Sequence, residues 1–201
     1  MTSKRIIGFS LAVILLLVFF YLYGGSTVPQ GQQPLVRLNG SNIGGLKDAF
    51  NASSNSVRLL VLDSPTRTVC LQGASALEKL LTEHRNPRVR VFVIWEPVLP
   101  TDFGAPSTAT LRRVSDLRAS QYWDKEHVVS HLLGERDRKS VVWDFVAVYQ
   151  PGKLWDQAPP DASYSGRRSS VLSVARAKPS RSYWSKHPPI IRSRELIALT
   201  M

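Results

Sequence analysis

The residue best suited to covalent chemistry in this chain is Cys70, the only cysteine among 201 residues. It follows an apolar run at residues 57–62 and opens an amphipathic run at residues 70–84, where a strand is expected to give way to a helix. A helix amino terminus stabilises a thiolate through its dipole and free N–H groups, so a thiol here can act as a nucleophile. One cysteine nevertheless excludes an internal disulfide and a self-contained dithiol cycle.

Position 67 decides what this thiol can do. In a Cys-x-x-Cys motif ending at Cys70, the attacking sulfur would stand at position 67, which is Arg67. A guanidinium cannot act as a nucleophile at any accessible pH. Cys70 is then either a small buried hydrophobic residue or a partly exposed reactive thiol, and the sequence leaves both alternatives open.

The elements around Cys70 form a strand, helix and strand unit. The continuous apolar character of residues 57–62 predicts a strand covered on both faces. Leucines at three- and four-residue spacing predict an amphipathic helix over residues 70–84, and residues 89–95 predict a second strand. Together they indicate a right-handed parallel crossover in an α/β domain.

Weaker patterns predict the remaining elements. They indicate a short helix at residues 46–51, helices at 108–117 and 124–133, a strand at 141–149, and a turn at 150–153 leading to a short partner strand at 154–155. Residues 35–160 are therefore expected to be the globular domain. No periodic pattern follows residue 160, so residues 161–201 are predicted to be a basic, disordered tail.

This order of elements resembles the thioredoxin-like family over residues 57–155. The register carries the resemblance, because it puts Cys70 at the place of the second cysteine of the motif, with Ser64 and Pro65 in the approach loop. The resemblance implies a three-layer thioredoxin-like α/β fold. It also implies that Cys70 is the resolving thiol, and that Arg67 holds the position of the missing catalytic nucleophile.

Two features depart from the family pattern. Some thioredoxin-like proteins carry selenocysteine at the attacking position, and its UGA codon differs from the arginine codon CGA by one base, so Arg67 is a candidate replacement for cysteine or selenocysteine. The family's usual proline before the third strand is also missing, since no proline occurs between Pro106 and Pro151. Residues 142–144 are expected to face the cysteine loop instead, with Asp144 near Cys70 and Arg67.

The loop after the second strand is a candidate binding segment. Residues 95–104 combine aromatic, acidic and proline residues at the carboxyl end of a parallel strand, where open α/β sheets bind ligands. The candidate binding residues are Trp95, Glu96 and Asp102, together with Asp144. The alternative is a rigid, proline-braced loop that packs Trp95 and Phe103 over the core.

Metal, cofactor and nucleic-acid functions find little support. His127 and His131 have the spacing of two zinc ligands on one helix face, but no third ligand is defined, so they are interpreted as surface or packing residues. No metal and no cofactor are expected. Basic residues do not alternate with the aromatic residues Trp143, Tyr149 and Trp155, so nucleic-acid binding is not expected in the folded region.

The amino-terminal segment predicts a membrane attachment. Residues 6–23 form an almost unbroken apolar run after Lys4 and Arg5, and as a helix the run would be ~27 Å long. An uncleaved single-pass anchor is favoured over a cleaved signal, because aromatic residues end the run. Residues 1–5 would be cytoplasmic, residues 24–34 a flexible linker, and the domain extracytoplasmic, either periplasmic or extracellular.

The net charge of +11 is concentrated in the tail, where eight basic residues and one acidic residue follow Gly166. Three functions are compatible with these features. The first is a degenerate relative of thiol–disulfide oxidoreductases that has lost its nucleophile. The second is a redox protein that uses Cys70 with the thiol of a partner protein or a small thiol such as glutathione. The third is a membrane-tethered binding module whose basic tail touches anionic lipid.

Overall fold

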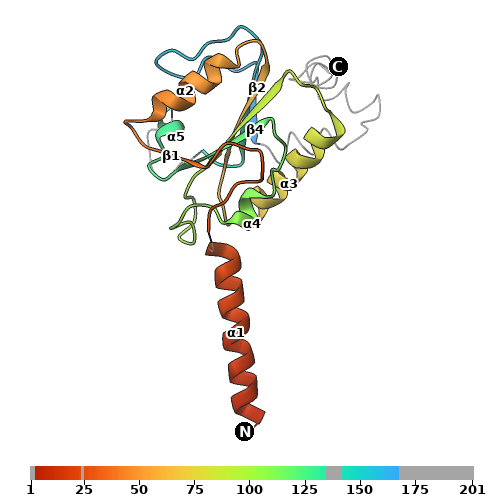
Figure 1. Ribbon diagram of the computed structural model, residues 1–201. Helices are drawn as coiled ribbons and strands as arrows, with labels where there is room; N and C mark the ends of the chain where they lie inside the picture. Colours follow the sequence, from red (N-terminus) through yellow and green to blue (C-terminus); the bar gives the residue numbers. More distant parts are fainter. Residues whose placement is uncertain (1–2, 24, 135–141, 168–201) are drawn as a thin grey trace, which may run out of the picture.

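A computed structural model of the protein describes residues 3–23, 25–134 and 142–167. Its centre is a six-stranded mixed sheet with the strand order β1-β4-β3-β2-β5-β6 (Figure 1). The first four strands in this order run parallel, and β5 and β6 are antiparallel to their neighbours. The strands are β1 (Val36–Leu38), β2 (Val57–Asp63), β3 (Val89–Trp95), β4 (Ala119–Asp124), β5 (Phe145–Tyr149) and β6 (Tyr164–Arg167).

Helices cover both faces of the sheet, which makes three layers. The helices α3 (Thr68–Glu83) and α4 (Thr108–Leu111) lie on one face, and α2 (Ile43–Ala52) and α5 (Val128–Leu132) on the other (Figure 1). Alternate residues of β2 enter the two cores, because successive side chains of a strand point to opposite faces. All seven β2 residues are buried, as the continuous apolar run predicts.

The predicted crossover of strand, helix and strand is confirmed. β2 and β3 are parallel neighbours in a register that pairs Val57 with Val89 and Asp63 with Trp95. The helix α3 between them buries Ala74, Leu77 and Leu81 against the sheet. The carboxyl ends of both strands therefore meet at one edge of the sheet.

Two predicted helices are shorter than expected, and a strand lies between them. The helix predicted at residues 108–117 ends at Leu111, and the one predicted at 124–133 begins only at Val128. Residues 119–124 instead form β4, which extends the parallel sheet beside β3. The prediction was wrong here because β4 is not an apolar run. It contains a polar residue, Gln121, that is buried.

The predicted hairpin has a different partner strand. Residues 154–155 are not a strand, and β5 pairs with β2 on one side and β6 on the other. Trp155 is buried against Phe50, and its backbone exchanges two hydrogen bonds with the side chain of Asn51. β6 lies beyond residue 160, so the folded domain extends past its predicted end. Residue 141 of the predicted strand lies outside the described residues, and so do residues 168–201 of the predicted tail.

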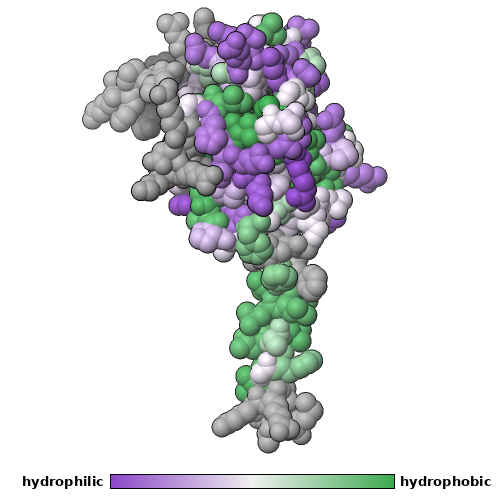
Figure 2. Space-filling view, turned by 90° about the vertical axis from the view of Figure 1, so that its left-hand side faces the viewer, coloured by the Kyte–Doolittle hydropathy of each residue, from purple (hydrophilic) through white to green (hydrophobic). Residues whose placement is uncertain are grey.

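The amino-terminal segment forms the helix α1 (Ser3–Tyr23), which projects from one end of the domain (Figure 1). Its apolar side chains from Ile7 to Phe19 are exposed, and Figure 2 shows them as an apolar stalk below a largely hydrophilic face of the domain. No helix in the described part of the chain has both the length and the apolar character that crossing a membrane would require.

Candidate functional site

Two loops leave the sheet where the parallel strands β2 and β3 end, beside the end of β4. The registers align Asp63 of β2 with Trp95 of β3, and Trp95 with Trp123 of β4. The loop at residues 64–67 leaves β2 and leads into α3, and the loop at residues 96–106 leaves β3. This edge is where an open α/β sheet offers a site, and it contains Arg67 and Cys70.

Cys70 is wholly buried in the first turn of α3. The backbone N–H of Arg67 donates to the Ser64 hydroxyl at 3.1 Å, and the Arg67 carbonyl accepts the first helical hydrogen bond, from Leu71, at 3.0 Å. Arg67 is thus the residue before the helix, and Cys70 is its third residue. The Cys70 side chain has no solvent exposure. Of the two alternatives, the structure therefore agrees with the buried residue and not with the partly exposed thiol.

Arg67 stacks on an aromatic ring from the opposite loop. Its guanidinium carbon lies 3.8 Å from the centroid of the Trp143 ring, within the range of a cation–π contact. Residues 142–144 were predicted to face the cysteine loop, and for Trp143 this is confirmed. Asp144, the next residue, is buried and has a positive φ of 52°. The strand predicted at residues 141–149 therefore begins only at Phe145.

The buried carboxylate of Asp102 joins two loops. One of its oxygens accepts hydrogen bonds from the Ser64 hydroxyl at 2.7 Å and from the backbone N–H groups of Val98 and Leu99, both at 2.9 Å. The other accepts from the N–H and hydroxyl of Thr66, at 3.1 and 2.5 Å. Both oxygens are therefore engaged within the protein, and Asp102 braces the loop that carries Arg67.

Trp95 and Glu96, predicted to share a binding loop, lie on opposite faces of the sheet. Adjacent residues of a strand point in opposite directions, and both of these side chains are fully buried. Trp95 packs on the α3 side, where its Nε1 donates to Gln121 at 3.0 Å. The alternative of a core-packing loop describes Trp95 correctly, but it is wrong for Phe103, which is exposed.

Glu96 belongs to a buried polar cluster on the α5 side. One of its oxygens accepts a hydrogen bond from the Ser130 hydroxyl and lies 3.3 Å from His127 Nδ1. Asp124, also buried, accepts from the Val129 N–H at 2.8 Å. Burial raises the pKa of the Glu96 carboxyl to about 7; hydrogen bonds from His127 and Ser130 oppose this rise, and the nearby Asp124 carboxylate adds to it.

His127 and His131 play different structural parts. His127 precedes α5 in a left-handed conformation with a φ of 57° and faces Glu96, whereas His131 is exposed in the last turn of the helix. Among the described residues, no three His, Cys, Asp or Glu side chains come together in a way that would hold a metal ion. The role of His127 could not be found from its spacing, because its partner is 31 positions away.

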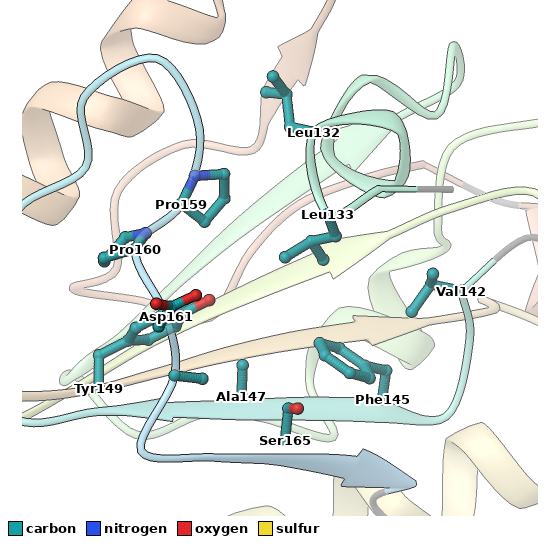
Figure 3. A pocket seen from close by; sticks show the side chains of 11 residues that line it. Leu132, Leu133, Val142, Phe145, Ala147, Tyr149, Pro159, Pro160, Asp161 and Ser165 are labelled. Atoms are coloured by element: carbon teal, nitrogen blue, oxygen red, sulfur yellow. The ribbon is translucent and has the colours of Figure 1, made fainter. Parts of the chain in front are cut away.

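A cavity of about 280 Å³ lies between the end of α5, β5 and the segment at residues 159–162. Figure 3 shows Leu133, Phe145 and Pro160 among its lining side chains. The cavity is lined mainly by apolar residues, and no feature of the sequence predicted it.

The order of the elements now decides the fold. A strand, a cysteine-bearing helix and a parallel strand are followed by two antiparallel strands, the first of which pairs with β2. This topology resembles the thioredoxin-like fold. Between β3 and β5 the chain also forms α4, β4 and α5, and β1 pairs with the outer side of β4.

Known proteins similar to this chain are found by structure. No protein-family model and no curated protein sequence matches it. A secreted disulfide oxidoreductase from Mycobacterium tuberculosis aligns with 61% of this chain and 81% of its own, at 11% identity and a TM-score of 0.39. The thioredoxin domain of a thiol-disulfide oxidoreductase from Bacteroides vulgatus aligns with 62% and 81%, at 10% identity and a TM-score of 0.37.

Proposed function

We propose that this protein is a membrane-anchored, extracytoplasmic thioredoxin-like protein that has lost the nucleophile of a thiol–disulfide oxidoreductase. The observation that carries the proposal is the position of Arg67, which directly precedes α3 and stacks on Trp143. A guanidinium there cannot attack a disulfide. The remaining thiol, Cys70, is buried in the first turn of α3, so its sulfur is not accessible from solvent.

The burial of Cys70 weighs against a monothiol role. A thiolate must reach the sulfur of its partner in line, and a thiol without solvent exposure meets neither glutathione nor a protein disulfide. The proposal therefore assigns Cys70 a packing role in the present protein. Ordinary alkylation kinetics test this assignment: Cys70 should react with iodoacetamide at neutral pH only after denaturation.

Restoring the first sulfur tests the proposed loss of activity. In Arg67→Cys, the thiolate at position 67 would attack a substrate disulfide and release one substrate thiol. Cys70 would then attack the mixed disulfide, release the second thiol and leave an intramolecular disulfide, which dithiothreitol reduces for the next turn. We expect reduction of insulin by Arg67→Cys, and none above background by the natural protein.

Two control variants make this result interpretable. Arg67→Ser removes the guanidinium without adding sulfur, and the double change Arg67→Cys with Cys70→Ala adds the attacking thiol without the resolving one. Neither should reduce insulin through repeated turns. Activity of the natural protein equal to that of Arg67→Cys would refute the proposed loss of function.

The proposed anchoring rests on the apolar run at residues 6–23 and on the exposure of its described side chains from Ile7 to Phe19. Lys4 and Arg5 precede the run, which favours a cytoplasmic amino end and an exported domain. Extraction of membranes with alkaline carbonate tests the anchoring. Protein that is released into the supernatant would contradict it.

A further inference from the structure

We propose that the end of the domain at which the parallel strands β2, β3 and β4 terminate, which carries Arg67, faces the lipid bilayer. The loop at residues 97–103 would be in contact with lipid. This inference rests on the proposed anchoring of α1 and adds which surface of the domain meets the membrane. It depends on the path of the chain after α1, on the contacts that connect this path to the Arg67 loop, and on the composition of the loop at residues 97–103.

The chain after α1 is fixed to the domain at its first residues. The Gly25 carbonyl accepts from the Thr108 N–H at 3.1 Å, and the Thr27 N–H donates to the Thr108 hydroxyl at 3.0 Å. Further on, the Gln32 amide donates to two backbone carbonyls of residues 114–116, at 2.9 and 2.8 Å. The segment predicted as a flexible linker thus lies along the domain, and α1 emerges beside α4 (Figure 1).

α4 is in turn tied to the loops of the candidate site. The Thr110 hydroxyl donates to the Pro65 carbonyl at 3.2 Å, which connects α4 to the loop that carries Arg67. Asp102 connects that loop to residues 97–103 through its bonds to Thr66. The exit of α1, the Arg67 loop and residues 97–103 therefore occupy the same end of the domain.

The loop at residues 97–103 has the surface of a membrane-contacting segment. Its single charged residue, Asp102, is buried, so the part that reaches solvent is uncharged. Pro100 is exposed, and the Phe103 side chain is 64% exposed. An exposed aromatic residue beside an anchoring helix is favoured at the boundary between headgroups and acyl chains.

Two other exposed apolar residues supply matched controls. Leu117, 70% exposed, precedes β4, and Leu154, 59% exposed, follows the end of β5 that pairs with the start of β2. Both lie at the end of the domain where the parallel strands begin, which is opposite to the end that carries Phe103. They share its exposure and apolar character but should face away from the bilayer.

Fluorescence quenching in vesicles tests the proposal. The full chain is reconstituted in phosphatidylcholine vesicles after labelling Phe103→Cys, Leu117→Cys, Leu154→Cys or Ile14→Cys with an environment-sensitive fluorophore. The unsubstituted protein reports any labelling of Cys70. We expect blue-shifted emission, quenching by brominated lipid and protection from aqueous iodide at positions 14 and 103. Labels at positions 117 and 154 should be quenched by iodide and not by brominated lipid.

The outcomes separate this proposal from the one on which it rests. Lipid quenching at position 14 together with iodide quenching at position 103 equal to that at 117 and 154 would overturn the orientation and leave the anchoring intact. Iodide quenching at position 14 would overturn the anchoring, and the orientation with it.

Discussion

Two polar regions lie where the parallel strands end, on opposite faces of the sheet. They differ in how many of their buried carboxylate oxygens accept hydrogen bonds. On the α3 face, both carboxylate oxygens of Asp102 accept hydrogen bonds from the loops around Arg67. On the α5 face, Glu96 and Asp124 each keep one buried oxygen that has no hydrogen-bond partner among the described residues.

The comparison shows that the hydrogen bonds that brace a loop do not depend on the chemistry of the residue that the loop presents. The loop at residues 64–67 keeps its full bracing although the residue it presents, Arg67, is not a nucleophile. The cluster around Glu96 contains more titratable groups, but they are buried. Ionising Glu96 in this cluster should lower the free energy of unfolding. Substitutions in each region should therefore change stability in different ways.

The largest effect is expected from Asp102→Ala. The change leaves the Ser64 hydroxyl and several backbone N–H groups without their buried acceptor, which should lower the free energy of unfolding by about 4 kcal/mol. Urea denaturation followed by circular dichroism measures the loss. Asp156→Ala is the control, because the Asp156 side chain is 93% exposed and its change should cost less than about 0.5 kcal/mol. Equal effects of the two changes would show that Asp102 does not brace the loops.

The pH dependence of stability should identify the second region. The pKa of Glu96 is raised in the folded protein from 4.5 to about 7, so between these values the unfolded chain releases this proton and the folded protein keeps it. The contribution of Glu96 to stability should therefore be fully present below about pH 4.5 and be lost as the pH rises to about 7. The loss attributable to Glu96 should be on the order of 3 kcal/mol.

Glu96→Gln should remove this component, because the amide is neutral throughout the range. Unfolding free energies at pH 5 and pH 7.5 are compared between the natural protein and the variant. Glu83→Gln, an exposed glutamate on α3, is the matched control and should retain the pH dependence. An identical slope in Glu96→Gln and the natural protein would mean that Glu96 does not titrate in this window.

The smallest effect is expected for the contact between Arg67 and Trp143. A double-mutant cycle with Arg67→Ala and Trp143→Leu should give a coupling free energy of about 1 kcal/mol, since the guanidinium lies over the ring. Thermal or urea unfolding of the four proteins measures it. Strictly additive effects would indicate that the stacking contributes nothing to stability.

The sequence predicted the β2, α3 and β3 unit because its signals are local. A continuous apolar strand, leucines at helical spacing and a second apolar strand follow one another without interruption, and the observed bounds differ from the predicted ones by two residues or fewer. β4 and β6 were missed since neither has a strong periodicity of its own. They form by pairing with β3 and β5, which a sequence pattern does not report.

The candidate site divides in the same way. That residue 67 is arginine and that only one sulfur of the motif exists are facts of the sequence, and they exclude a dithiol cycle by composition alone. Only the tertiary structure decided that Cys70 is buried, that Arg67 meets Trp143, and that Trp95 and Glu96 are separated by the sheet. The physical reason is that burial and ring stacking depend on how the layers pack, which brings together residues that are far apart in the chain.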